Sequence, residues 1–168
     1  MLTLFAPLLL LAQSAAAAPV ENVAAAAATV GKIRGVRDPI YHLYLQASPK
    51  NSSKPVLGPE SAAEEFTIGG TIQSKKTNQF LNIATASTSY KPLVWGAKGE
   101  TTAWGLEGDT IITTQGSSYG RQLNFLVCNS ADAGYYDLFL QTGSDAPSGK
   151  TCSNYQTIHL PVGGSSDD

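Results

Sequence analysis

The stretch Lys91-Pro92-Leu93-Val94-Trp95-Gly96 repeats an earlier one, Lys54-Pro55-Val56-Leu57-Gly58, at a distance of 37 residues. A second pair of positions shows nearly the same offset, since Trp104 follows Phe66 by 38 residues. Self-similarity at a fixed distance of about 40 residues is typical of repeat architectures, in which each repeat is one supersecondary unit. These matches predict a domain made of similar consecutive units.

A third unit follows, with strand-like runs at 123–128, 136–140 and 155–158. Between residues 39 and 162, short runs rich in Leu, Ile, Val, Tyr, Phe and Thr alternate with Gly, Pro, Asn and Ser clusters, a pattern typical of many short strands. Three units of about four strands predict an all-β fold, the β-trefoil, whose closed barrel leaves few strand edges exposed. The alternative is another β-sandwich or barrel.

The N-terminus predicts secretion. Leu2 to Leu11 is an almost unbroken apolar run followed by small residues, which is typical of a signal peptide and too short to span a membrane. We expect a signal peptide at 1–18, a flexible Ala-rich leader at 19–38, a single domain at 39–162 and a polar tail at 163–168. The expected location is extracellular or cell wall, with no membrane association after the signal is removed.

Charge and cysteine content narrow the partners and cofactors. The chain carries 11 basic and 13 acidic residues, a near-balance that does not favour nucleic-acid binding. Its two cysteines, Cys128 and Cys152, predict one disulfide in an oxidising compartment. Asn51-Ser52-Ser53 is an N-glycosylation sequon in a Pro-, Lys- and Ser-rich loop, which predicts a glycoprotein.

The sequence does not favour catalysis. The chain has two histidines, His42 and His159, which are too few for a three-ligand catalytic metal site. Glu64, Glu65, Glu107 and Asp109 are expected in turns or at strand ends, which does not suggest the paired carboxylates of a glycosidase. Nucleophile elbows, phosphate loops and zinc signatures are not found. We therefore predict a protein that is not an enzyme and uses neither metal nor cofactor.

Positions that are apolar in several units predict the core. Trp104 belongs to this class because it aligns with Phe66. The other predicted core positions are Leu43, Leu45, Ile68, Ile72, Leu81, Ile83, Leu106, Ile111, Phe125 and Val127.

Positions that break the repeat are the candidate binding residues. Trp95 aligns near Gly58 and is flanked by Lys91 and Lys98, so an exposed indole there could stack on a sugar ring. Tyr135, Tyr136 and Asp137 form a second candidate, an aromatic pair beside a carboxylate. The alternative interpretation is that both groups of aromatic residues cap the hairpin layer of the fold.

Residues 123–162 carry a resemblance to a known family. An apolar strand ends in cysteine (Phe125-Leu126-Val127-Cys128), a Tyr-rich strand follows (Tyr135-Tyr136-Asp137-Leu138), and a second cysteine precedes the last strand. This region resembles the C-terminal domain of fungal Pir-type cell-wall mannoproteins. Gly70-Thr71-Ile72 through Phe80-Leu81-Asn82 is loosely similar to an earlier unit of that domain. The resemblance covers about half of the expected mature chain.

The resemblance implies a small secreted fungal protein of the cell wall or its surroundings. It does not extend to covalent wall attachment, because the family's glutamine-containing repeats are missing and the family domain has more cysteines. We therefore expect a non-catalytic module that binds cell-wall polysaccharide or another glycan. The alternatives are a trefoil-type protease inhibitor, which would present a loop such as 51–53 or 144–150 to a secreted protein, and a structural or effector-like protein without a small ligand.

Overall fold

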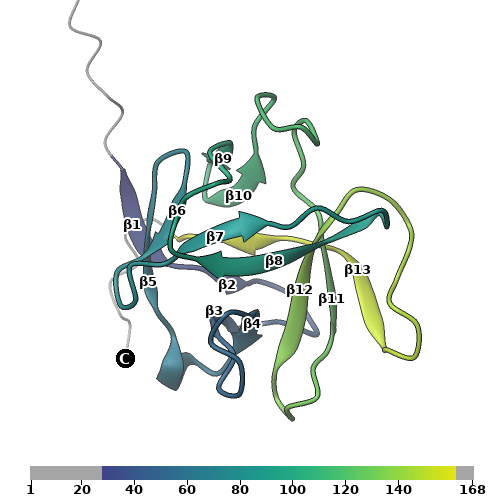
Figure 1. Ribbon diagram of the computed structural model, residues 1–168. Coiled ribbons are helices and arrows are strands. Elements are labelled where there is room, and N and C mark those ends of the chain that lie inside the picture. Colours follow the sequence, from purple (N-terminus) through teal and green to yellow (C-terminus); the bar gives the residue numbers. More distant parts are fainter. Residues whose placement is uncertain (1–27, 162–168) are drawn as a thin grey trace, which may run out of the picture.

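The computed structural model describes residues 28–161 (Figure 1). Regular structure there is almost entirely β-strand, with one 3-10 turn, η1, at Glu60–Ala62. The strands form a curled antiparallel sheet with the shape of a half-barrel. The prediction of an all-β fold is confirmed. The predicted signal peptide, most of the predicted leader, Val162 and the polar tail lie outside the described residues.

The strands are short and joined by turns. In chain order they are β1 (Thr29–Lys32), β2 (Arg34–Gly35), β3 (Tyr44–Ala47), β4 (Pro55–Gly58), β5 (Glu65–Ile68), β6 (Ile72–Ser74), β7 (Phe80–Ile83), β8 (Tyr90–Gly96), β9 (Trp104–Glu107), β10 (Thr110–Thr113), β11 (Phe125–Asn129), β12 (Tyr136–Gln141), β13 (Cys152–Gln156) and β14 (Ile158–His159). Neighbours in the sheet follow the order β1-β5-β6-β7-β8-β12-β4-β3-β2-β14-β10-β9, and β11 pairs with both β12 and β13.

The described part of the predicted leader is folded, so the prediction of a flexible segment up to residue 38 is wrong there. Strand β1 pairs with β5 over four residues, from Thr29 opposite Ile68 to Lys32 opposite Glu65. Ile33 is fully buried in the core. The folded domain therefore includes residues 29–38, because strand pairing across the chain holds a segment that has no amphipathic pattern of its own.

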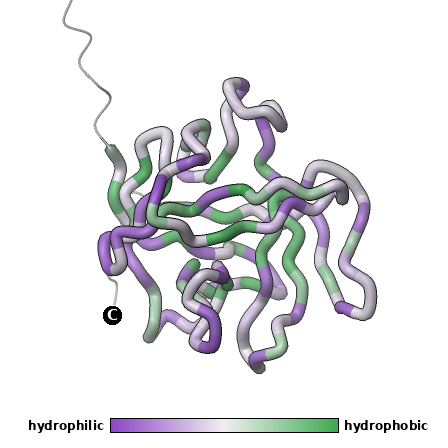
Figure 2. Tube along the Cα trace, in the orientation of Figure 1, coloured by the Kyte–Doolittle hydropathy of each residue, from purple (hydrophilic) through white to green (hydrophobic). Residues whose placement is uncertain are grey.

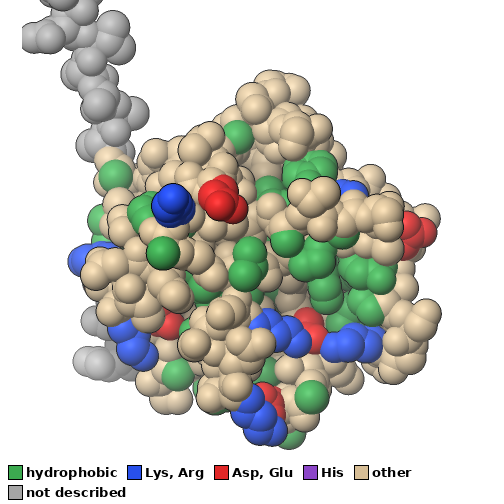
Figure 3. Space-filling view, in the orientation of Figure 1, with side chains coloured by type: hydrophobic (Ala, Val, Ile, Leu, Met, Phe, Trp, Pro, Cys, Tyr) green, Lys and Arg blue, Asp and Glu red, His purple; other side chains and the backbone are tan. Residues whose placement is uncertain are grey.

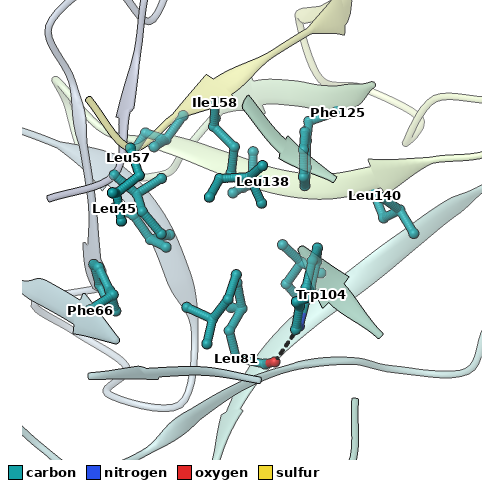
Figure 4. Close-up of a cluster of buried hydrophobic side chains, with 14 of the residues drawn as sticks. Leu45, Leu57, Phe66, Leu81, Trp104, Phe125, Leu138, Leu140 and Ile158 are labelled. Carbon is teal, nitrogen blue, oxygen red and sulfur yellow. Dashed lines mark hydrogen bonds between the residues drawn. The ribbon is translucent and has the colours of Figure 1, made fainter. Parts of the chain in front are cut away.

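The core lies inside the curl of the sheet. Figure 2 shows hydrophobic residues concentrated on the strands that cross the middle of the molecule, with hydrophilic residues toward the loops. In Figure 4, side chains from opposite sides of the sheet point toward one another, and the Trp104 indole Nε1 donates a hydrogen bond to the Leu81 carbonyl at 2.9 Å. Most of the predicted core positions are buried, and the other three, Leu43, Ile83 and Leu106, are partly buried and pack against the core.

Three hairpins each bring a pair of buried residues to the core. The cross-strand pairs are Leu45 opposite Leu57 in β3–β4, Leu81 opposite Trp95 in β7–β8, and Val127 opposite Leu138 in β11–β12. All six side chains are buried. A fully buried side chain of this size contributes about 1.5–3 kcal/mol, so the hairpins are major contributors to stability.

Candidate functional site

Trp95 is a core residue, which corrects the expectation of an exposed indole. It is 4% exposed, and its ring stacks on that of Phe66 with the centroids 5.6 Å apart. Counting from the Lys-Pro pairs had placed Trp95 opposite the position of Gly58. The run from Lys91 to Gly96 contains one more residue than the run from Lys54 to Gly58. In the strand register Gly96 is the counterpart of Gly58, and Trp95 is the counterpart of Leu57. A shift of one residue moves a strand side chain to the other face of the sheet.

The structure does not bring Lys91 and Lys98 together around an exposed indole. The Lys91 ammonium donates to the carbonyl oxygens of Ala86 at 2.7 Å and Thr88 at 2.6 Å, and it lies 5.6 Å from the ring centre of Tyr119. The Lys98 side chain is exposed, and its carbonyl accepts a hydrogen bond from the side-chain amide of Asn82. Lys91 therefore holds the turn before β8 together.

Asp137 is buried and ion-paired. Its side chain is 1% exposed, with the Lys54 ammonium 2.7 Å from Oδ1 and the Lys150 ammonium hydrogen-bonded to Oδ2. Burial raises the pKa of Asp137, but the hydrogen bonds and charges of Lys150 and Lys54 outweigh it, so the pKa lies below its ordinary value. The carboxylate links the loop before β4 to the loop before β13.

Tyr135 and Tyr136 are half-buried beside that cluster. A Cβ atom on Gly58 would overlap the Tyr135 ring, so the ring packs directly on the backbone of β4. Tyr136 packs against the core. The two tyrosines line a shallow pocket of about 180 Å³ with Asn129, Ser130 and residues 132–134. The predicted group 135–137 thus joins strands β4 and β12, and its two tyrosines line the pocket whereas Asp137 does not.

The disulfide between Cys128 and Cys152 is present, as the sequence predicts, and joins β11 to β13. Asn51 is exposed in the turn before β4, where its side-chain oxygen accepts a hydrogen bond from the backbone N–H of Ser53 at 3.1 Å. Its glycosylation stays a prediction.

The two histidines occupy different settings. His42 lies in an exposed turn with φ +55°, outside any strand. His159 on β14 is hydrogen-bonded through Nδ1 to Asp109 Oδ1 and through Nε2 to Thr157 Oγ1, both at 2.9 Å. A nucleophilic triad has the same order of hydroxyl, imidazole and carboxylate. Thr157 and His159, however, lie only two residues apart in one segment and line neither the shallow pocket of the two tyrosines nor the two larger pockets described below. The contacts hold β14 to the turn between β9 and β10.

A larger pocket, of about 280 Å³, lies between two loops that the sequence did not single out. One wall is the segment before β9 and the other is the loop between β10 and β11. Most of the lining side chains carry hydroxyl groups, so we name it the hydroxyl pocket. Its lining residues are Ile83, Thr85, Glu100, Thr101, Thr102, Ala103, Gly116, Ser117, Ser118 and Tyr119.

A single buried amide holds the first wall. Asn82 on β7 is 4% exposed, and its Oδ1 accepts the backbone N–H groups of Glu100 at 2.9 Å and Thr101 at 3.1 Å. Its Nδ2 donates to the Lys98 carbonyl at 2.8 Å. Because buried amides need their hydrogen bonds satisfied, this geometry fixes the loop and leaves the Glu100 and Thr102 side chains directed away from the core.

A buried hydroxyl holds the second wall. Thr113, fully buried at the end of β10, donates to the Gly120 carbonyl at 2.8 Å and accepts the N–H of Gln122 at 2.9 Å. The Gln122 side chain donates to the Tyr119 carbonyl at 3.1 Å. Tyr119 thus reaches the pocket from a loop tied at both ends, with the Lys91 ammonium against its ring.

The chemistry of the hydroxyl pocket suits a polar, uncharged ligand with many hydroxyl groups. Hydroxyl side chains both donate and accept hydrogen bonds, and Tyr119 adds an aromatic surface. Sequence reasoning missed the pocket because Thr and Ser are ordinary loop residues. The usable signal was Asn82, a polar residue between the predicted core positions Leu81 and Ile83.

Two further features concern ions and membranes. Within residues 28–161, His, Cys, Asp and Glu side chains do not gather in groups of three or more that could hold a metal ion. Over the same residues, no helix has the length and apolar character needed to cross a membrane.

Comparison of the chain with protein-family models, with curated proteins and with solved structures gives no match.

Proposed function

We propose that this protein is a non-catalytic module that binds a glycan, with cell-wall polysaccharide as the expected ligand and the hydroxyl pocket as its site. The observation that carries this proposal is the pocket's lining. It combines hydroxyl side chains, the Glu100 carboxylate and the Tyr119 ring on two loops that buried side chains hold in place. Preorganised polar groups beside an aromatic surface suit a ligand that presents hydroxyls and C–H faces.

The wider setting of the proposal comes from the sequence. The signal peptide, the sequon at Asn51 and the resemblance to Pir-type proteins favour a secreted fungal glycoprotein. The disulfide is compatible with an oxidising compartment. We further propose a β-trefoil arrangement, supported by the hairpins β3–β4, β7–β8 and β11–β12, which recur along the chain and bring buried pairs to one core.

Retention on insoluble fungal wall polysaccharide tests the proposal. The double variant Thr102→Ala, Ser118→Ala removes two exposed hydroxyls of the pocket, and we expect about tenfold weaker retention, because each hydrogen bond contributes about 0.5–1.5 kcal/mol. The matched control Ser61→Ala, Thr151→Ala removes the same two groups from exposed positions outside the pocket and should bind as the wild type does.

Equal retention of the two double variants would remove the hydroxyl pocket from the proposal. A wild-type protein that is not retained at all would overturn glycan binding, and inhibition of secreted proteases becomes the function to test. The loop at 144–150 is the segment for that test, because it is held to Ser89 by the Asp145 backbone and side chain.

A further inference from the structure

Strand β13 contains a bulge that turns one aromatic side chain out of the sheet. Phe125 pairs with Gln156 and Val127 with Ser153, so two residues of β13, Asn154 and Tyr155, lie opposite the single residue 126 of β11. Tyr155 is 58% exposed. Bulges re-aim side chains and are frequent next to functional sites, where a regular strand would have the wrong direction.

The backbone of Tyr155 is strained. Its φ is +54°, in the left-handed region, which bulky side chains rarely adopt. Such positions persist only where the surroundings impose them, and they cluster at ligand sites. An exposed tyrosine at this position gains little core packing that would offset the strain.

One buried side chain imposes this conformation. Gln141 at the end of β12 is 3% exposed, and its Oε1 accepts the backbone N–H of Tyr155 at 2.8 Å. Its Nε2 donates to the Gly143 carbonyl and to the Asn154 side chain, both at 3.0 Å. Gln141 therefore fixes the bulge and the adjoining loop together, as Asn82 fixes the wall of the hydroxyl pocket.

Tyr155 borders a pocket of about 390 Å³, which we name the amide pocket. None of the described residues that line it carries a charge. Amide and hydroxyl groups dominate the lining, and the tyrosine supplies its aromatic side. The lining residues are Gln122, Asn124, Gln141, Thr142, Gly143, Ser144 and Tyr155.

We propose that the amide pocket is a second saccharide-binding site, which takes a neutral sugar unit on the Tyr155 ring and the neighbouring amides. Amides offer paired donors and acceptors, and a ring face packs on the C–H groups of a sugar. The absence of charge in the lining excludes an ionic anchor, and the lack of aliphatic side chains disfavours the apolar anchors of a peptide.

The two pockets meet at one loop, which points to a single extended ligand. Tyr119 lines the hydroxyl pocket, Gln122 lines the amide pocket, and the Gln122 side chain donates to the Tyr119 carbonyl. A polysaccharide chain that crosses this loop would occupy both sites. This part of the inference rests on the proposed function, whereas the amide pocket can be tested by itself.

The positive φ of Tyr155 allows a variant that tests binding separately from stability. Tyr155→Asn replaces the ring by a residue that tolerates positive φ, so we expect an unchanged or higher melting temperature together with at least tenfold weaker binding. Tyr41→Ala is the matched control, because Tyr41 is similarly exposed, at 57%, and does not line the amide pocket. The control should bind within twofold of the wild type.

The measurement is a titration of 15N-labelled protein with three neutral hexasaccharides: β-1,3-linked glucose, β-1,4-linked N-acetylglucosamine and α-linked mannose. At least one should shift the side-chain amide signals of Gln122 and Asn124 and the backbone signals of Gly143 and Tyr155. These shifts should disappear in Tyr155→Asn and remain in Tyr41→Ala.

Other outcomes separate the two proposals. Shifts confined to Thr102, Ser118 and Tyr119 would overturn the amide pocket and leave the proposed function in place. Shifts confined to the amide pocket would support this inference and remove the hydroxyl pocket. Equal binding by Tyr155→Asn and the wild type, or no response to any of the three sugars, would overturn the inference.

Discussion

The loops around Asp137 and the loops around Asn82 use buried polar side chains in opposite ways. Asp137 is paired with the ammonium groups of Lys54 and Lys150, so the charged groups of that region are occupied within the protein. Asn82 binds only backbone groups, and the Glu100 and Thr102 side chains of its loop are exposed. We therefore look for ligand-binding side chains on loops whose backbone is held by a buried polar residue. Regions rich in charged and aromatic residues are poorer candidates when those residues bind one another.

Figure 3 shows how charged side chains are distributed on one face of the molecule. On the face that it shows, acidic and basic side chains lie next to each other, and hydrophobic side chains gather near the place where β8 and β12 meet. In that region the rings of Tyr90 and Phe139 pack edge to face at 5.4 Å. Charge that is already neutralised by a neighbour contributes little further attraction for a ligand.

Trp95→Ala should have the largest effect on stability, and it tests whether a prominent aromatic residue serves the core and not the binding site. Because the indole is buried against Phe66, its removal leaves a cavity, and we expect a loss of about 3–5 kcal/mol in the free energy of unfolding. Denaturant unfolding measures this loss, and Trp95→Phe should recover a large part of it. A variant as stable as the wild type, yet weaker in glycan binding, would return Trp95 to the binding site.

Asn82→Ala should have the next largest effect and should also reduce binding. It leaves the backbone N–H groups of Glu100 and Thr101 without their acceptor, each at a cost of about 1–3 kcal/mol where water does not replace it. We expect a loss of about 2–4 kcal/mol by the same reasoning. Polysaccharide retention, measured well below the melting temperature, should fall with it. Unchanged retention would show that the loop does not need this anchor.

Asp137→Asn should have a smaller effect that depends on pH. Both lysine partners are more than a third exposed, so solvent screens the pairs, and we expect a loss of about 1–2 kcal/mol at neutral pH. The pKa of Asp137 is lowered on folding, so its contribution is complete above the unfolded pKa of about 3.9 and is lost as the pH falls through the folded value.

The stability difference between wild type and Asp137→Asn should therefore be constant from neutral pH down to about pH 5 and shrink below about pH 4. Urea unfolding at several pH values measures it, and glycan retention at neutral pH should stay unchanged. A difference that grows on acidification would contradict the ion-pair assignment.

The sequence predicted the all-β class and much of the core because short apolar runs, and their recurrence, can be seen along the chain. Leu45, Leu81 and Val127 follow from that recurrence, and the disulfide follows from having two cysteines. The residues of β1 carry no such signal, because β1 is held in place by pairing with β5, which is distant in the sequence. The close packing of β1 also involves a distant residue, since a Cβ atom on Gly31 would lie 3.2 Å from the Leu160 side chain.

The candidate sites were harder to predict than the fold. The run from Lys91 to Gly96 has one residue more than the run from Lys54 to Gly58, and only the strand register shows that Trp95 corresponds to Leu57 and faces the core. Tyr155 was assigned to a plain strand, because a bulge is defined by the partner strand and not by the residues at 154 and 155. Both pockets are built from loops that meet only after folding, so their Thr, Ser and Gln residues have no spacing that could be read along the chain.

The position of β14 has a consequence for how this chain acquires its fold. Ile158–His159 lies between β2, near the start of the described residues, and β10. During synthesis, more than a hundred residues that follow β2 are therefore made before β14, the second neighbour of β2, exists. Contacts between such distant segments give a high contact order, which slows folding. Completion of the sheet therefore depends on bringing together residues that are far apart in the sequence.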